Sequence, residues 1–208
     1  MKKKKLLIFG KISTGAEIYE IVTSHYSNDY DSIEMILFND NFIEEFDLKE
    51  KLDNPAYTLN YIIGFSDYQQ RVKCVNTMNT FSNTKAVSII NPTAYIAKSA
   101  KIGDGCYIGA NATISTNAVI KNHASINLNV SIGHDAVINE HVLILPGVRI
   151  SGHVNVGEGT LIGANAFVHQ KVTIGKENLI DALTYVRNDL PDRMVSSSRS
   201  AKPFKRLF

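Results

Sequence analysis

A histidine followed directly by an aspartate stands in the segment NVSIGHDAVI, residues 129–138. A neutral imidazole, with an ordinary pKa of about 6.5, can take up a proton at physiological pH. A neighbouring carboxylate can orient the ring and raise its basicity, as in many base–orienter pairs of enzymes. The pair His134–Asp135 is therefore a candidate general base with its supporting acid. The structural alternative is a polar turn in which Asp135 caps nearby backbone amides.

A six-residue repeat surrounds this pair. Counted in sixes from Ile90 to Val186, every position holds isoleucine or valine, and the residues two places earlier are mostly small or β-branched. Residues two apart on a strand face the same side, so each hexapeptide turns one small and one large side chain inward. The period predicts short strands joined by corners, with three hexapeptides to a coil. Cys106 falls in the small inward column and is expected in the core rather than as a nucleophile.

The corners of the predicted prism carry glycines and histidines. We expect sharp turns at the glycines that directly follow aliphatic positions, because glycine tolerates backbone conformations closed to other residues. They are Gly103, Gly109, Gly133, Gly157, Gly163 and Gly175. No histidine of the repeat occupies an inward column. His123 and His141 are three hexapeptides apart and should stack, and His153 should lie one coil above Asp135.

Residues 1 to 87 follow a different pattern, in which strands alternate with helices. The expected strands are KKLLIFG, IEMILF and YIIGFSD, and the expected helices are ISTGAEIYEIVTSHY and YQQRVKCVNTM. This alternation predicts a small parallel α/β domain, whose ligands would bind at the carboxyl ends of the strands. Gly10, Asp40 and Gly64 would border such a crevice. We therefore expect an α/β domain over 1–87, a β-helix over 88–186 and a tail over 187–208.

Composition limits the class of partner. The 208 residues carry a net charge of +2, which gives no strong field for nucleic acid or an anionic membrane. The start MKKKKLLIFG has an apolar run shorter than the roughly 7–15 residues of a secretory signal, and no stretch approaches the ~20 apolar residues of a membrane span. Cys74 and Cys106 have no CxxC or metal-ligand spacing. A soluble, cytoplasmic protein is expected.

Several segments carry a resemblance to a known family: FND after the second strand, IIGFSDYQQR, NPTA at the domain junction, and NLNVSIGHDAVI followed by PGVRISGHV. With the hexapeptide repeat, they resemble the bacterial sugar acetyltransferases of the bacillosamine, perosamine and sialic acid pathways. The resemblance covers residues 5 to about 175. It implies a left-handed parallel β-helix, a handedness outside the usual crossover rule, preceded by a Rossmann-like domain that holds the nucleotide in the nucleotide-sugar members.

The chain departs from the family's pattern in several places. The family's GxGGxG-like first turn reads GKISTG here, which keeps only Gly10 and Gly15. A histidine that helps to position the acetyl group commonly stands where this chain has Leu143. A glycine-rich run near the coenzyme is replaced by LIDALTY, and the terminal GxPAK-like turn is reduced to SRSAK. These departures fall on the nucleotide and acetyl-coenzyme A sites rather than on His134.

The resemblance implies an acetyl-coenzyme A-dependent N-acetyltransferase that acts on the amino group of a nucleotide-linked amino-deoxy sugar, by direct transfer and without a metal. By the same resemblance His134 is the general base and Asp135 its supporting acid, while Leu143 and Gly152 lie at the acetyl-coenzyme A site. The coenzyme would lie in a groove between neighbouring subunits, which implies a homotrimer.

Beyond Val186 the six-residue repeat ends and basic residues gather: Arg199, Lys202, Lys205 and Arg206. These side chains, Lys202 among them, could meet the phosphates of acetyl-coenzyme A. A solvated basic tail is the alternative.

Three other functions compete with the N-acetyltransferase. The first is an O-acetyltransferase of a free sugar such as sialic acid, and the second is a non-catalytic scaffold. The third is a zinc-dependent carbonic anhydrase of the γ type, whose GHxAxLH-like motif is similar to IGHDAVIN. At the second ligand position of that motif this chain has Asn139, a poor zinc ligand, so we expect no metal.

Overall fold

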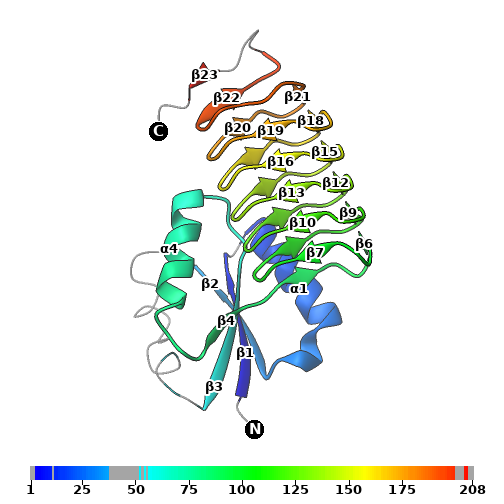
Figure 1. Ribbon diagram of the computed structural model, residues 1–208. Coiled ribbons are helices and arrows are strands. Elements are labelled where there is room, and N and C mark those ends of the chain that lie inside the picture. Colours follow the sequence, from blue (N-terminus) through cyan, green and yellow to red (C-terminus); the bar gives the residue numbers. More distant parts are fainter. Residues whose placement is uncertain are drawn as a thin grey trace. The chain divides into compact units, whose positions relative to one another are not determined.

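The computed structural model describes residues 3–10, 12–37, 52, 54, 56–199 and 204–205. The chain divides into two compact units, Met1–Ile89 and Ile90–Phe208 (Figure 1). Within the described residues, no helix has both the length and the apolar character needed to cross a lipid bilayer.

The first unit is built on a four-stranded sheet in the order β2-β1-β3-β4. Its strands are β1 (Lys3–Phe9), β2 (Ser32–Ile36), β3 (Tyr57–Ile63) and β4 (Thr84–Ala86). All neighbours in the sheet are parallel. Residues Leu6 to Phe9 of β1 are fully buried, as expected of a parallel strand covered on both faces.

Two helices accompany this sheet, α1 (Thr14–His25) and α4 (Tyr68–Met78), with a short 3-10 helix, η1 (Ser27–Asp29). The buried face of α1 holds Ile18, Ile21 and Val22, as the sequence predicts. Helix α4 begins where the Asp67 carboxylate accepts a hydrogen bond of 2.8 Å from the Gln70 N–H, a common way to satisfy a helix start. The other predicted elements agree closely with the structure, whereas β3 begins at Tyr57, before the predicted strand, and β4 was not predicted.

The second unit is a parallel β-helix whose strands form three sheets. The first sheet contains β5 (Ile89–Ile90), β8 (Tyr107–Ile108), β11 (Ser125–Ile126), β14 (Leu143–Ile144), β17 (Leu161–Ile162), β20 (Leu179–Ile180), β22 (Met194–Ser196) and β23 (Phe204–Lys205). The second contains β6 (Tyr95–Ile96), β9 (Thr113–Ile114), β12 (Ser131–Ile132), β15 (Arg149–Ile150), β18 (Phe167–Val168) and β21 (Tyr185–Val186). The third contains β7 (Lys101–Ile102), β10 (Val119–Ile120), β13 (Val137–Ile138), β16 (Asn155–Val156) and β19 (Thr173–Ile174).

Neighbouring coils pair at an offset of three hexapeptides, so that Ile126 lies beside Ile144 and Ile132 beside Ile150. Both inward columns form one hydrophobic core, and Cys106 is fully buried in it. Three parallel sheets with this coil length fit the left-handed β-helix that the resemblance implies (Figure 1).

The sharp turns do not lie at the glycines where the sequence analysis expected them. Gly133 has an ordinary backbone conformation. Glycine is needed at this position because a Cβ would lie 2.5 Å from the carbonyl carbon of Ser151 in the next coil. The left-handed residue comes two places later, at Asp135 with φ 57°. The same conformation recurs at every sixth residue of the corners: Gly105, Asn111, Asn117, His123, Asn129, Asp135, His141, Gly147, His153, Gly159, Asn165, Lys171, Glu177 and Leu183. The expectation that the chain turns at the glycines themselves is therefore wrong, and close approach of the coils is the physical reason for them.

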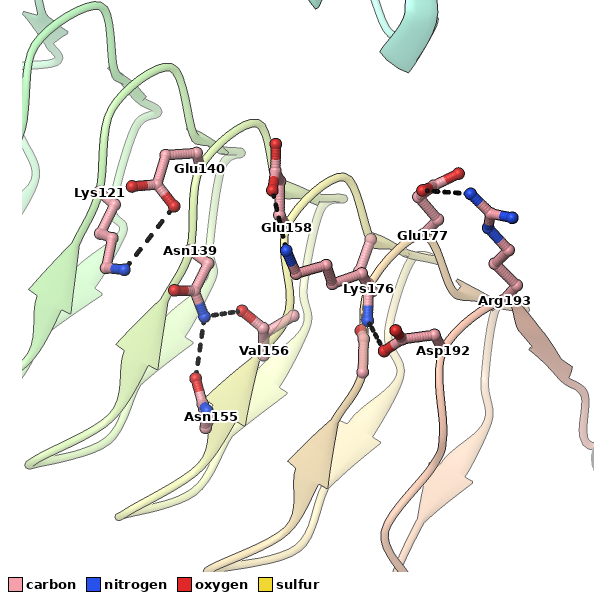
Figure 2. A network of polar contacts seen from close by, with 12 residues as sticks. Lys121, Asn139, Glu140, Asn155, Val156, Glu158, Lys176, Glu177, Asp192 and Arg193 are labelled. Atoms are coloured by element: carbon pink, nitrogen blue, oxygen red, sulfur yellow. Dashed lines mark hydrogen bonds and ion pairs between the residues drawn. The ribbon is translucent and has the colours of Figure 1, made fainter.

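The corner between the third and first sheets carries paired charges (Figure 2). Its ion pairs are Lys121–Glu140 at 3.7 Å, Lys176–Glu158 at 3.5 Å and Arg193–Glu177 at 3.2 Å. Each pair joins successive coils. Exposed pairs of this kind contribute only about 0–1 kcal/mol each, so this corner is a neutralised surface rather than a charged patch.

The β-helix closes with a shorter coil beyond Val186. Strand β22 pairs parallel with β20, but Ile180 lies beside Ser196, an offset that falls short of three full hexapeptides. Strand β23 then pairs antiparallel with β22. The first sheet, which is parallel up to β22, therefore ends in an antiparallel strand pair.

Replacement of Ile114 by alanine should lower the free energy of unfolding by about 2–5 kcal/mol, because it removes buried methyl groups from the stacked core and leaves a cavity. Thr113→Ala is the matched control, since that neighbouring side chain is exposed. Urea denaturation of the full chain would measure both. Equal losses in the two variants would contradict the assignment of the inward column.

Candidate active site

His134 and Asp135 lie on one corner of the prism, between β12 of the second sheet and β13 of the third. We name the stacked segments 115–118, 133–136, 151–154 and 169–172 the His134 corner. Its coils are joined by backbone hydrogen bonds, for example from the His153 N–H to the His134 carbonyl at 2.9 Å. Both side chains of the pair point outward, with exposed fractions of 55% for His134 and 38% for Asp135. The pair is therefore open to a ligand from solvent.

The imidazole and the carboxylate are in direct contact. His134 Nδ1 lies 2.8 Å from Asp135 Oδ2. A carboxylate can only accept a hydrogen bond, so in a neutral imidazole the Nδ1 atom carries the hydrogen. The lone pair is then on Nε2, at the far end of the ring. This tautomer is the one in which Nε2 can accept a proton.

Asp135 is also held from the neighbouring coil. The Asn117 side-chain amide donates a hydrogen bond of 3.1 Å to Asp135 Oδ1. The hydrogen bond with His134 and then that from Asn117 lower the pKa of Asp135 below its ordinary value. The carboxylate therefore stays ionised where the imidazole works, with one oxygen held by each partner.

Gly152 lies against the His134 ring in the next coil. A Cβ built on Gly152 would come within 2.6 Å of His134 Nε2. Here glycine is required by a close approach to the imidazole, since any side chain would displace the ring. The space beside Nε2 is left open by the missing side chain.

His153 lies on the same corner, above Asp135, as the sequence predicts. Its Nε2 atom is 3.9 Å from Asp135 Oδ2. Its ring meets the His134 ring edge to face, with centroids 4.9 Å apart. Within the described part of the chain, His134, Asp135 and His153 form a group whose metal-ligating atoms all lie within 4.8 Å of one another.

The other predicted stack also exists, at a different corner. The rings of His123 and His141 are stacked with centroids 5.1 Å apart. Both residues are buried, in contrast to the exposed rings of His134 and His153. Their role in the fold is packing between coils.

Leu143, which the resemblance places with Gly152 at the acetyl-coenzyme A site, does not join this group within one chain. It lies on β14 in the first sheet and is buried. The His134 corner lies between the second and third sheets. Leu143 and His134 thus occupy opposite sides of the prism.

Gly10 and Gly64 follow β1 and β3 at the carboxyl edge of the sheet in the first unit. A Cβ on Gly10 would lie 2.9 Å from the Gly64 carbonyl oxygen, and a Cβ on Gly64 would lie 2.5 Å from Gly15 Cα. These glycines let the ends of two strands and the start of α1 pack backbone against backbone. Asp40 and Lys202 lie outside the described residues.

A groove of about 520 Å³ lies on the other edge of the second sheet. Among its lining residues are Asn129, Ser131, Gly147 and Arg149. The Arg149 guanidinium donates hydrogen bonds to the carbonyl oxygens of Asn129 and Gly147. The groove is therefore polar and carries a fixed cation.

Asn117 is the residue of this site that the sequence analysis missed. It stands one full coil before Asp135, at the same offset that correctly placed His153. Applying that offset in both directions from Asp135 would have found it.

Comparisons with known proteins agree with the fold. The model of the bacterial transferase hexapeptide matches residues 85–116, and the model of the hexapeptide repeat of succinyl-transferase matches residues 153–186. A search of curated protein sequences found no match.

Solved structures resemble the chain over nearly its whole length. The acetyltransferase domain of PglB from Neisseria gonorrhoeae has a TM-score of 0.83 and 22% identity, covering 96% of this chain and 99% of its own. PerB from Caulobacter crescentus, in complex with CoA and GDP-perosamine, has a TM-score of 0.82 and 22% identity, covering 96% and 97%. WeeI from Acinetobacter baumannii has a TM-score of 0.84 and 17% identity, covering 97% and 100%. The chain therefore carries the hexapeptide repeat of bacterial transferases and has the fold of these acetyltransferases.

Proposed function

We propose that the chain is an acyltransferase that moves the acetyl group of acetyl-coenzyme A to the amino group of a nucleotide-linked amino-deoxy sugar. The observation that carries the proposal is the exposed His134–Asp135 pair. The Nε2 atom of His134 lies beside Gly152, where the absence of a side chain leaves room next to the ring. The transferase repeats and the acetyltransferase fold support the reaction class. PglB has been solved in complex with acetyl-coenzyme A.

The reaction needs one base. The amine nitrogen attacks the thioester carbonyl carbon, the carbonyl electron pair moves to oxygen, and His134 Nε2 takes the proton that leaves the nitrogen. The tetrahedral intermediate then collapses with cleavage of the carbon–sulfur bond, and the departing thiolate takes the proton from His134. Asp135 stabilises the imidazolium that exists between these two steps. A positioned base of this kind contributes about 10²–10⁴-fold to the rate.

Acetyl-coenzyme A would lie with its acetyl group beside Gly152 and its phosphates toward the basic tail that contains Lys202. Leu143 is on the opposite side of the prism from His134, so the two residues of one subunit cannot meet the same acetyl group. We propose a homotrimer with the coenzyme between subunits, as the resemblance implies.

The amino sugar would be held through its nucleotide by the first unit, which we infer to be Rossmann-like. Support comes from the parallel β2-β1-β3-β4 sheet, from Gly10 and Gly64 at its carboxyl edge, and from the complex of PerB with GDP-perosamine. Asp40 is the third residue that the sequence predicts at this crevice. A free sugar accepted at a hydroxyl group is the competing substrate, and the same base could serve it.

Replacement of His134 by alanine should reduce coenzyme A release by about 10²–10⁴-fold, because the base is removed. The assay follows coenzyme A release from acetyl-coenzyme A over UDP-, dTDP- and GDP-linked 4-amino-4,6-dideoxy sugars, with free sialic acid as a further acceptor. His25→Ala is the control, since His25 is an exposed histidine at the end of α1 and outside the His134 corner. Unchanged turnover in the His134 variant would refute its role as the base, and turnover only with sialic acid would refute the nucleotide-linked acceptor.

Gly152→Ala should lower kcat by up to about 10²-fold, because the new Cβ would push the His134 ring out of position. The nearest atoms to that Cβ belong to the side chain of His134 rather than to backbone, so the melting temperature should change little. Ser151→Ala serves as the neighbouring control. A variant that kept normal kcat would show that the ring has room to move without loss.

Asn117→Ala should raise the pKa of Asp135, because it removes one of the hydrogen bonds that hold the carboxylate ionised. A carbon-13 carboxyl NMR titration would measure this, with Asn111→Ala as the control that shares the left-handed backbone but lies on another corner. A depressed folded pKa contributes stability above the unfolded pKa, and this contribution is lost as the pH falls through the folded pKa. The difference in unfolding free energy between wild type and Asn117→Ala that arises from this hydrogen bond should therefore vanish in acid. An unchanged pKa of Asp135 in the variant would exclude Asn117 as a positioning residue.

A further inference from the structure

The His134 corner holds a second histidine close to Asp135, His153, which the acetyl-transfer reaction does not use. His153 directs its Nε2 toward the Asp135 carboxylate, at 3.9 Å from Oδ2. His134 Nδ1 lies 2.8 Å from the same oxygen. We propose that His134, Asp135 and His153 form a site for a divalent transition-metal ion, and that the bound ion switches off the general base.

The donor set suits such an ion. Two imidazoles and one carboxylate are ligands typical of zinc and of other late first-row metals. Tetrahedral zinc with bonds of about 2.0–2.2 Å needs its ligand atoms roughly 3.3–3.5 Å apart. The ligating atoms here all lie within 4.8 Å of one another, so small side-chain rotations would bring them to that separation. Half-exposed side chains leave the fourth position to water.

The fold brings the three ligands together by stacking of coils. Asp135 and His153 occupy equivalent left-handed positions of successive coils, with φ of 57° and 58°. His134 precedes Asp135 directly, the two imidazoles meet edge to face, and each has a nitrogen near the same carboxylate. Asn117 holds the second oxygen of that carboxylate, so Oδ2 is the oxygen offered to an ion.

The consequence for His134 follows from its tautomer. In the working arrangement the hydrogen is on Nδ1 and the lone pair on Nε2. An ion bound at Nδ1 displaces that hydrogen, and the neutral ring then carries its hydrogen on Nε2 instead. Nε2 has no lone pair left for the amine proton. Metal binding and acetyl transfer thus exclude each other at one imidazole.

The binding part of this proposal is independent of the proposed function, whereas the inhibitory part rests on it. The two parts are therefore measured separately, on the full chain without a histidine tag. Titration calorimetry with zinc chloride gives the affinity, and the absorption of bound Co²⁺ reports the coordination. Coenzyme A release is followed in parallel, with each variant compared with its own metal-free rate.

Wild-type protein should bind one zinc ion per subunit, show a higher melting temperature with zinc, and lose turnover until a chelator restores it. His153→Asn should weaken zinc binding by at least about tenfold, the loss that even an outer-shell substitution typically causes. The zinc concentration needed for inhibition should rise in the same proportion. His25→Asn, which removes an exposed histidine at the end of α1 and outside the His134 corner, should leave both quantities unchanged.

Equal zinc affinity in wild type and His153→Asn would overturn the site, because the ion would then be bound elsewhere. Absence of zinc binding in the wild type would also overturn it. Zinc bound in the manner described, with no turnover on any acceptor, would support the metal site and refute the proposed acetyltransferase. Normal turnover that zinc does not affect, despite binding that depends on His153, would overturn the switch.

Discussion

Hydrogen bonding between successive coils is the constraint on which the rest of the β-helix depends. Each inner strand of the three sheets pairs with its counterparts in the coil before and the coil after, so positions inside the stack have equivalent neighbours above and below. The inward columns become a continuous core in this way. The corners become columns of residues with one backbone conformation, and side chains at those positions meet across coils. A functional site on this fold is therefore assembled from residues that are distant in the sequence but occupy equivalent positions in successive coils.

The His134 corner illustrates how this assembly works. Asp135 occupies a left-handed position, a conformation that aspartate and asparagine tolerate better than most residues. Asn117 and His153 occupy the same position in the coils before and after it. The carboxylate thus receives partners from both sides, while His134 reaches it along the chain. A geometry needed for folding of the corner also positions the polar side chains.

Much of this arrangement was predictable from the six-residue period. The position of a residue within its hexapeptide determines whether it lies on a strand or at a corner, and also which residues of the neighbouring coils lie beside it. The contacts of His153 with Asp135 and of His123 with His141 followed from the offset of three hexapeptides. The same arithmetic places Leu143 half a coil away from His134, and hence on the opposite side of the prism.

Other features depend on distances that a residue pattern does not contain. The glycines after the aliphatic positions reflect how closely two backbones approach, as Gly133 and Ser151 do, and not a turn. The direction of the Asn117 amide toward Asp135 is a side-chain property of the folded coil. The shortened pairing offset between β20 and β22 could not be predicted, because the aliphatic repeat does not continue into β22.

That shortened last coil also bears on whether the coils of a second copy could stack onto the first sheet at this end. A stack of parallel coils ends in exposed strand edges onto which another stack could add, and repeat proteins generally need a distinct terminal element to prevent this. Strand β23 runs antiparallel along β22, so the outer edge of the first sheet no longer offers the direction and register of a regular coil. A second stack of parallel coils therefore finds no matching strand edge to extend at β23.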